Sequence, residues 1–334
     1  MKLGDMQQNP RHLINGRWEI GTTTGVSTNP SDTREVVAEH ARADRNQTEQ
    51  AVRAASDALA SWSHSNPQRR ADVLDLIGSE LLARKDELGK LLAREEGKTL
   101  PEAVAEVARS GQIFKFFAGE ALRIPGELHA SVRQGVQVDV TREPVGVVGI
   151  IAPWNFPFAI PAWKIAPALA YGNTVVFKPA ENVPTCGWAL SEIISRSGLP
   201  AGAFNLIMGS GREAGQTLVD HPLVNAVSFT GSVATGTRVL QATTARRARV
   251  QLEMGGKNPL VVLADADLDQ AVECALQGGY FSTGQRCTAS SRFIVEAGVH
   301  DAFVARLRQR LETLKVGHAL ERGTEMGPVV DEQQ

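Results

Sequence analysis

Cysteine is scarce in this chain, with 3 residues among 334, at Cys186, Cys274 and Cys287. A small, odd number of cysteines does not describe a disulfide framework and is typical of a reducing compartment, so we expect a cytoplasmic protein. The 7 histidines are scattered, and none stands at metal-ligand spacing from another histidine or a cysteine. The sequence therefore predicts no metal site.

An excess of charge of one sign is also lacking. The net charge is -2 and the isoelectric point is near 6.4, which is not the basic footprint of a protein that binds nucleic acid or an anionic membrane. Residues 1–10 contain no apolar core of a signal peptide. We expect no nucleic-acid partner, no membrane partner and no secretion signal.

A long uninterrupted apolar run is missing too. Segment 145–172 is almost wholly apolar and long enough to span a bilayer, but four prolines interrupt it. Asn155 and Lys164 would also lie in the hydrocarbon, where an amide and an ammonium group are costly. The segment therefore predicts a buried strand, a loop and a buried helix.

The chain is long enough for about two domains. Segment 14–42 contains the Gly, Thr and Asn-Pro residues that are typical of short strands and turns. Segment 46–123 has the apolar spacing of amphipathic helices that cover a sheet. Beyond Pro144, short apolar strands alternate with helices, which is typical of a parallel α/β sheet. Strands are expected at 145–152, 174–178, 203–208 and 225–229, with helices at 161–170, 184–197 and 211–220. A second unit begins near Glu253, with strands at 259–263 and 292–295 and helices at 268–280 and 300–314.

Segment 126–142 has a different pattern. Val136, Val138 and Val140 alternate with polar residues, which predicts an exposed strand that forms one arm of a hairpin. Because an unpaired strand edge seeks a partner, we interpret this hairpin as an assembly element.

Two strand-to-helix turns contain glycine. Segment 209–215 comes close to a G-x-G-x-x-G motif, but its third glycine is one position late, so it predicts a turn and a helix start. In segment 229–236, Gly231, Ser232 and Gly236 can bring backbone N–H groups close to a pyrophosphate. Lys178 and Glu181 follow another strand and can hold the two hydroxyls of an adenosine ribose; a surface ion pair, worth less than about 1 kcal/mol, is the alternative.

Cys287 lies in the turn Gly284-Gln285-Arg286-Cys287-Thr288. Small and polar neighbours can keep its sulfur accessible and favour the thiolate. A structural cysteine that packs as a small hydrophobe is the alternative, and the local sequence leaves both open.

Five motifs follow one another along the chain, namely Pro153-Trp154-Asn155-Phe156-Pro157, Lys178-Pro179-Ala180-Glu181, Phe229-Thr230-Gly231-Ser232, Leu252-Glu253-Met254-Gly255-Gly256-Lys257 and Gly284-Gln285-Arg286-Cys287. Together they resemble the aldehyde dehydrogenase superfamily, from about Leu13 to the last residue, and their order makes the resemblance specific. The finer similarity is to bacterial semialdehyde dehydrogenases, particularly the 2-oxoglutarate semialdehyde type.

The resemblance implies an α/β fold with a Rossmann-type parallel-sheet domain for the dinucleotide over residues 1–252. A protruding oligomerisation hairpin is expected at about 124–143, and residues 253–334 are expected to form the first part of an α/β catalytic domain. The family also implies a homo-oligomer.

The resemblance further assigns chemistry to three residues. Cys287 resembles the nucleophile that forms a thiohemiacetal and then a thioester. Asn155, with the Cys287 backbone N–H, resembles the oxyanion donor. Glu253 resembles the base that activates water for release of the acid.

Residues for the cofactor and the substrate follow from the same resemblance. Glu181 would repel a 2′-phosphate, so NAD is favoured over NADP, which stays possible. Phe156 and Trp163 resemble aromatic residues of the aldehyde tunnel, although core packing explains Trp163 equally well. Arg286 is the nearest cation for a charged semialdehyde. The residues expected to line the dinucleotide groove are Trp154, Lys178, Glu181, Thr230, Gly231, Ser232 and Gly236.

The chain departs from the family pattern because its sequence stops soon after Met326-Gly327-Pro328. Family members continue well beyond this point, so part of the catalytic domain is expected to be missing, with apolar surface left exposed. Three functions stay open: an NAD(P)-dependent dehydrogenase acting on 2-oxoglutarate semialdehyde, succinate semialdehyde or another aldehyde; a non-catalytic remnant that binds a dinucleotide or a partner subunit; and a CoA-acylating enzyme. Glu253 argues against the last, because hydrolysis is the step that needs a base.

Overall fold

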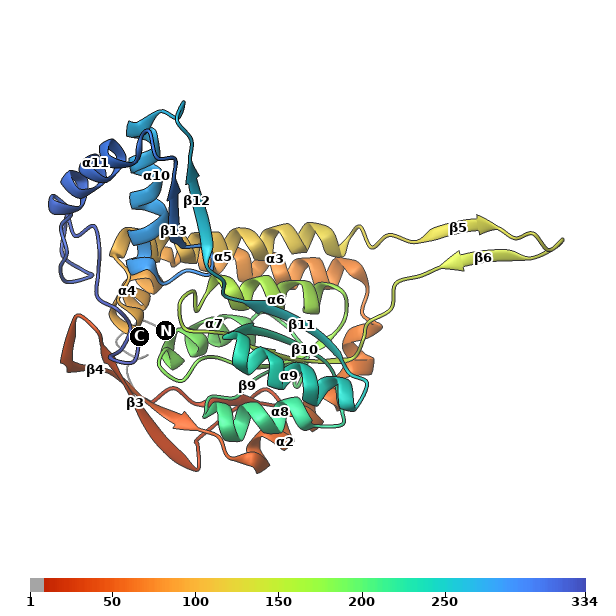
Figure 1. The fold of residues 1–334 in the computed structure, drawn as a ribbon. Coiled ribbons are helices and arrows are strands. Elements are labelled where there is room, and N and C mark those ends of the chain that lie inside the picture. The colour runs from red at the N-terminus through yellow and green to blue at the C-terminus, as the bar shows by residue number, and fades with distance from the viewer. Residues whose placement is uncertain (1–8) are drawn as a thin grey trace.

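The computed structural model describes residues 9–334, so the expectation of no signal peptide falls largely outside them. A seven-stranded sheet forms the centre of the larger unit, in the order β11-β10-β7-β8-β9-β1-β2 (Figure 1). The strands from β11 to β9 are parallel, whereas β1 and β2 add an antiparallel edge. The strand bounds are β1 (His12–Ile14), β2 (Arg17–Glu19), β7 (Val147–Ile151), β8 (Thr174–Lys178), β9 (Phe204–Leu206), β10 (Val224–Gly231) and β11 (Arg249–Met254).

Helices cover both faces of this sheet, which explains why its central strands are continuously apolar. Successive residues point to opposite faces, so Val148 and Val175 enter one core whereas Val147 and Val176 enter the other. One core is covered by α3 (Pro67–Ala83), α4 (Lys85–Glu96), α5 (Leu100–Ala121), α6 (Ala159–Ala170) and α7 (Pro184–Ser195). The other is covered by α2 (Arg45–Ser63), α8 (Gln216–Asp220) and α9 (Val233–Ala245).

A smaller β-α-β-α unit follows. Its parallel strands β12 (Asn258–Val262) and β13 (Ser290–Val295) pack with α10 (Leu268–Tyr280) and α11 (His300–Glu312) around a core that includes Val262, Val272 and Phe303. The chain then returns to the first unit, where the Leu100 backbone N–H donates to the Ala319 carbonyl at 3.0 Å. The two units therefore meet at the start of α5.

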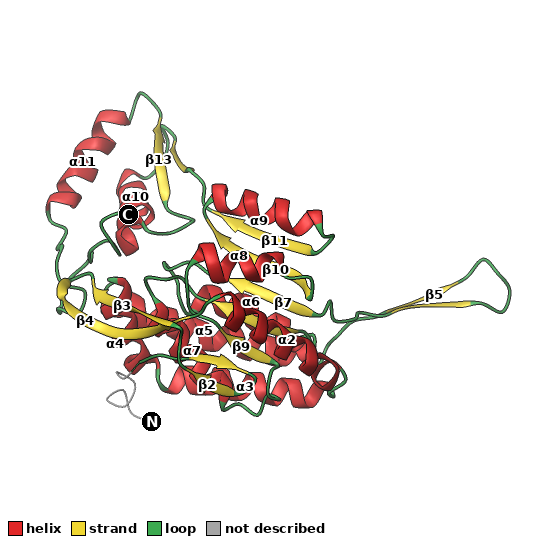
Figure 2. Cartoon of the chain, turned by 90° about the horizontal axis from the view of Figure 1, so that it is seen from below, coloured by secondary structure: helices red, strands yellow, loops and turns green. Residues whose placement is uncertain are grey.

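Two hairpins complete the fold. Strands β3 (Thr23–Asn29) and β4 (Asp32–Arg42) form an antiparallel pair that contacts α4 and α7. Strands β5 (Glu127–Ala130) and β6 (Gln137–Val140) form an antiparallel arm that projects far from the body (Figures 1 and 2). Its side chains are exposed, including the apolar residues Leu128, Val132 and Val138.

The predicted fold class is confirmed, and some elements match to the residue. Strand β8 and helix α10 begin and end where the sequence predicts. Segment 145–172 forms β7, a loop and α6, and no helix within residues 9–334 combines the length and apolar character needed to cross a membrane. Among the helices expected from the sequence, 211–220 is divided into a π-helical turn η1 (Gly211–Gly215) and α8.

The expected domain boundary at 252/253 shifts slightly in the structure. Glu253 pairs with Thr230 on β10, and Met254 pairs with Gly231. The sheet of the first unit therefore includes Glu253, and the chain leaves it at Gly255. The strand continues through Glu253 and Met254 and ends at the pair Gly255-Gly256, because glycine weakens a strand.

Candidate active site

The carboxyl ends of the parallel strands define one edge of the sheet. The register places Ile151 beside Lys178, Phe229 beside Ile151, and Gly231 beside Met254. The loops after β7, β8, β10 and β11 therefore emerge together, at the place where open α/β sheets bind ligands. The turn η2 (Phe281–Gly284) and the cysteine loop come from the second unit to meet them.

The three residues predicted to be catalytic line one open pocket. Asn155 comes from the loop after β7, Glu253 from β11 and Cys287 from the second unit, and the pocket has a volume of about 530 Å³. Four of the predicted cofactor residues and one predicted substrate residue line the same pocket, namely Trp154, Thr230, Gly231, Ser232 and Arg286.

Cys287 is exposed, which favours the accessible thiol over the structural cysteine that its sequence neighbours also allowed. The loop before it is unusual, because Ser282, Thr283 and Gly284 all have positive φ, at 49°, 58° and 68°. For a serine and a threonine this left-handed conformation costs on the order of 1–3 kcal/mol each, and it persists only where neighbouring groups enforce it. On the other side of the cysteine, Asn258 Nδ2 donates to the Cys287 carbonyl at 2.7 Å.

The side chain of Asn155 reaches from the first unit to the cysteine loop. Its Nδ2 donates to the Gln285 carbonyl at 2.9 Å. An amide nitrogen carries two hydrogens, so one anchors the side chain while the second stays available for another acceptor. The buried Oδ1 of Asn155 has no hydrogen-bond partner among the described residues.

Glu253 is exposed on β11 and is supported by a polar chain that the sequence did not reveal. Gln251 Nε2 donates to Glu253 Oε1 at 2.8 Å, and Lys164 Nζ donates to Gln251 Oε1 at 3.0 Å. Burial lowers the pKa of Lys164 to about 8, although the charge of Glu253 opposes this. In the sequence, Lys164 counts only as an obstacle to a membrane span, because nothing local links it to β11.

The adenosine end of the predicted groove lies beyond the main pocket. Lys178 is buried at the end of β8, and burial lowers its pKa to about 8 against the opposing charge of Glu181. It lines a second pocket of about 400 Å³ between α8 and α9, together with Gly211 and Gly215. Glu181 Oε1 accepts from the Gly211 backbone N–H at 2.8 Å.

The turn at 209–215 therefore contributes more to this groove than the sequence pattern indicates. A Cβ on Gly215 would lie 3.5 Å from Lys178 Cε, in van der Waals contact, so a larger side chain would fill the space beside the lysine. The glycines were the available signal, but their mismatch with the G-x-G-x-x-G spacing favoured a turn and a helix start over contact with a phosphate.

The turn at 229–236 has the geometry expected at a helix start. Ser232 is the N-cap of α9, and its Oγ accepts from the Thr235 N–H at 3.3 Å. Both glycines also serve close packing: a Cβ would lie 2.6 Å from Phe229 Cζ at Gly231 and 2.5 Å from Met254 Sδ at Gly236. At Gly231 the packing against the Phe229 ring therefore gives a reason for glycine, whereas at Gly236 the flexible side chain of Met254 could move aside.

The predicted substrate residues are less clearly placed. Phe156 lies under Lys98, with Nζ 4.0 Å from the ring centroid, and Trp163 packs edge-on against Phe117. Neither is among the residues that line the pocket at Cys287.

The structure does not support Arg286 as a free cation for the substrate. Its guanidinium donates to the carbonyls of Gln277 and Gly278 and lies over the Phe281 ring. It therefore caps the C-terminal turn of α10, where the helix dipole favours a positive charge. The sequence neighbourhood of Cys287 does not show this, because the direction of the side chain depends on the packing of α10.

The arrangement combines an exposed thiol, an amide donor and a carboxylate around one space. These are the groups for nucleophilic addition to a carbonyl, stabilisation of the resulting oxyanion and activation of water. Within residues 9–334, no group of three or more His, Cys, Asp and Glu side chains is placed to hold a metal ion.

Known proteins are similar to this chain in sequence over nearly its whole length. Alpha-ketoglutaric semialdehyde dehydrogenase of Bacillus subtilis is 43% identical over 97% of this chain and 67% of its own length. Alpha-ketoglutarate semialdehyde dehydrogenase of Haloferax volcanii is 41% identical over the same shares. The chain thus spans about two thirds of the length of these relatives.

Solved structures agree with the sequence comparison. An aldehyde dehydrogenase from Brucella melitensis biovar abortus matches with a TM-score of 0.96 and 34% identity, over 98% of this chain and 68% of that one. Betaine aldehyde dehydrogenase from Staphylococcus aureus, solved in complex with NAD+, matches with a TM-score of 0.95 and 36% identity, over 97% and 65%. The family model for aldehyde dehydrogenases matches residues 19–334. The chain therefore belongs to the aldehyde dehydrogenase family.

Proposed function

We propose that this chain carries the active site for oxidation of an aldehyde to a carboxylic acid with NAD, and that the aldehyde is a semialdehyde such as 2-oxoglutarate semialdehyde. The observation that carries the proposal is the meeting of Cys287, Asn155 and Glu253 in one pocket at the carboxyl edge of the sheet. The names of the relatives support the substrate class, and succinate semialdehyde is the nearest alternative.

The reaction begins at the sulfur of Cys287. Its thiolate adds to the aldehyde carbon, so a C–S bond forms and the carbonyl electrons move to oxygen. The free hydrogen of Asn155 Nδ2 and the Cys287 backbone N–H are the donors for this oxyanion. Donors of this kind typically contribute about a hundred- to a thousandfold in rate.

The residues at the sheet edge fit a dinucleotide. The buried ammonium of Lys178, the space that glycine leaves at position 215, and the N-terminus of α9 at Ser232 suit an adenosine and a pyrophosphate. A bound NAD would supply the hydride acceptor there, and loss of the hydride would convert the thiohemiacetal on Cys287 into a thioester. Glu181 disfavours a 2′-phosphate, which supports NAD over NADP.

Glu253 completes the cycle. Its carboxylate takes a proton from water, the resulting hydroxide attacks the thioester carbon, and the C–S bond breaks to give the acid and the free thiol. Because Glu253 lies on β11 and Cys287 on the second unit, the space between them is where that water would enter. A carboxylate in this position supports hydrolysis rather than transfer of the acyl group to CoA.

The test is aldehyde-dependent formation of NADH by the purified chain, followed at 340 nm with 2-oxoglutarate semialdehyde and with succinate semialdehyde. Turnover that disappears in Cys287→Ala is expected. Saturable NAD binding without NADH formation would favour a non-catalytic chain instead, and an acyl-CoA product would favour the acylating alternative.

The exposed β5–β6 hairpin supports a homo-oligomer as the assembled form, since its strands offer unpaired edges. The scarcity of cysteine supports a cytoplasmic location.

A further inference from the structure

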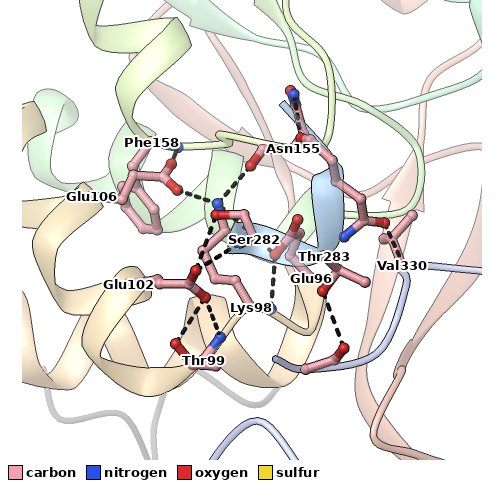
Figure 3. Close-up of polar contacts among 12 residues, drawn as sticks. Glu96, Lys98, Thr99, Glu102, Glu106, Asn155, Phe158, Ser282, Thr283 and Val330 are labelled. Atoms are coloured by element: carbon pink, nitrogen blue, oxygen red, sulfur yellow. Dashed lines mark hydrogen bonds and ion pairs between the residues drawn. The ribbon is translucent and has the colours of Figure 1, made fainter. Parts of the chain in front are cut away.

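Four ionisable side chains lie buried together behind the active site. Lys98, Glu96, Glu102 and Glu106 have exposed fractions of 1%, 0%, 8% and 5%, and they come from the end of α4, the short loop after it and the first turns of α5 (Figure 3). Burying an ion costs several kcal/mol unless ion pairs and hydrogen bonds offset the lost hydration. Apolar residues of similar size often stabilise a fold equally well. None of the four has a role in the chemistry above.

Lys98 contacts the loop that carries the oxyanion donor. Its Nζ donates to Glu106 Oε2 at 2.7 Å and to the Asn155 backbone carbonyl at 2.6 Å. Burial lowers the pKa of Lys98, but the carboxylates of Glu106 and Glu96 outweigh this and raise it above the ordinary value. The ammonium group therefore stays charged while it holds the backbone of Asn155.

Glu106 holds the other end of the same loop. Its second oxygen, Oε1, accepts from the backbone N–H groups of Phe158 and Ala159 at 2.9 and 3.2 Å. These lie at the start of α6, where N–H groups have no partner within the helix. Lys98 and Glu106 thus fix the loop at Asn155 and again three residues later.

Glu102 makes the matching contact with the nucleophile loop. Its Oε1 accepts from the Ser282 N–H at 2.7 Å, and its Oε2 accepts from the Thr99 N–H at 2.9 Å. Ser282 is one of the residues with positive φ, so this contact enforces the strained turn that precedes Cys287. Figure 3 shows Glu102 and Glu106 extending from α5 toward Ser282 and Phe158, with Lys98 joined to Glu106 and Asn155.

We propose that Lys98, supported by Glu106, is a positioning residue that acts through Asn155 to place the oxyanion donor opposite Cys287. This inference rests on the proposed roles of Asn155 and Cys287. It explains why the charged contacts end on the backbone of Asn155 and of the loop before Cys287. Oxyanion donors must lie about 2.7–3.1 Å from the developing charge, and a shift of about 1 Å can cost about a hundredfold in rate.

The test separates oxyanion stabilisation from thiol access. In a Cys274→Ser background, p-nitrophenyl acetate acylates Cys287 through an oxyanion and releases one equivalent of p-nitrophenolate, whereas iodoacetamide alkylates the same sulfur without one. The ratio of the two rates is the measured quantity. Lys98→Met is expected to lower this ratio about 100-fold, with the alkylation rate and NAD affinity changed less than about threefold.

A matched control and a double-mutant cycle make the result specific. Asp75→Asn with Lys115→Met removes an exposed ion pair, also anchored on α5, whose atoms lie 2.6 Å apart, and is expected to leave the ratio unchanged. Asn155→Ala is expected to lower the ratio as Lys98→Met does, and the double variant no further, because Lys98 acts through Asn155.

Two outcomes overturn the proposal: a ratio unchanged in Lys98→Met, or losses that multiply in the double variant. If Lys98→Met does not fold, the double variant Lys98→Met with Glu106→Gln replaces it, because it leaves neither charge of this pair unpaired. Its ratio is also expected to fall about 100-fold. Failure of the proposed function is distinguishable, because it appears as absence of aldehyde-dependent NADH in the unmodified chain while the acylation-to-alkylation ratio still responds to Lys98.

Discussion

The side-chain amide of Gln251 donates a hydrogen bond of 2.8 Å to the carboxylate of Glu253. The two residues lie two positions apart on β11, so their side chains share one face of the strand. Lys164 and Ser228 hold the other end of Gln251. The candidate base is therefore supported by the first unit alone, whereas the nucleophile belongs to the second.

This separation predicts that the two residues can be distinguished kinetically. Glu253→Gln should leave a stoichiometric burst of NADH and slow the later turnover about 100- to 10,000-fold, because only thioester hydrolysis loses its base. Rapid-mixing absorbance at 340 nm measures both phases. Cys287→Ala is the comparison and should show neither phase; loss of the burst in both variants would contradict the assignment.

The cofactor preference is predicted to depend on the carboxylate of Glu181. Glu181→Ser should improve the affinity for NADP relative to NAD by about tenfold, because a charge that repels the 2′-phosphate is removed. Quenching of protein fluorescence measures both affinities. Glu213→Gln is the control, because it removes another acid from the neighbouring turn. The hydrogen bond of Glu213 to Ser210 Oγ comes from the Glu213 backbone N–H and would be kept. An equal change in both variants would show a general effect of net charge.

Burial raises the pKa of Glu96 to about 7, so this residue predicts a pH-dependent stability. Between the unfolded value near 4.5 and the folded value, the unfolded chain has already lost the proton that the folded chain retains. The folded state therefore loses stability as the pH rises through this window, and the full penalty is present above pH 7.

Glu96→Gln removes the titration. Its free energy of unfolding should equal that of the unmodified chain near pH 4.5 and exceed it at pH 8, by an amount on the order of 1–3 kcal/mol. Urea denaturation at a series of pH values tests this. A difference that stays constant with pH would show that Glu96 does not titrate in this range.

The β5–β6 hairpin predicts assembly through an exposed arm. Val138→Asp with Leu128→Asp places charge on side chains that are 42% and 67% exposed in the single chain. If a second copy covers them, the variant should sediment as a smaller species, because an unpaired charge in an interface is costly. Sedimentation velocity provides the measurement, and unchanged oligomer size would exclude the hairpin as the contact.

The sequence predicts well those features that depend on neighbouring residues. Strand β8 and helix α10 follow from apolar runs and helical spacing, whereas the small neighbours of Cys287 allow its exposure without requiring it. Asn155 and Glu253 meet because parallel strands bring their carboxyl ends to one edge, and the loop that carries Cys287 reaches this edge from the second unit. The resemblance to a known family supplied their roles.

The features that the sequence does not predict depend on distant partners. Lys98 and Glu106 have the composition of a solvated helix surface, and only the packing of α5 against two later loops shows that they are buried. Arg286 looks free in the sequence because its acceptors belong to the preceding helix. Glu253 seemed to begin a second unit because its pairing with Thr230 cannot be read locally.

The contact between Glu102 and Ser282 also has a consequence for the order of folding during synthesis. The two residues are 180 positions apart. At about 5–20 residues per second, the ribosome adds Ser282 roughly 10–40 s after Glu102. During this interval α5 can already pack, but Glu102 lacks the hydrogen bond from the Ser282 N–H. Because contacts between distant segments form slowly, the thiol should gain its surroundings only after residues 282–287 have been added, when the sheet beneath it has already begun to fold.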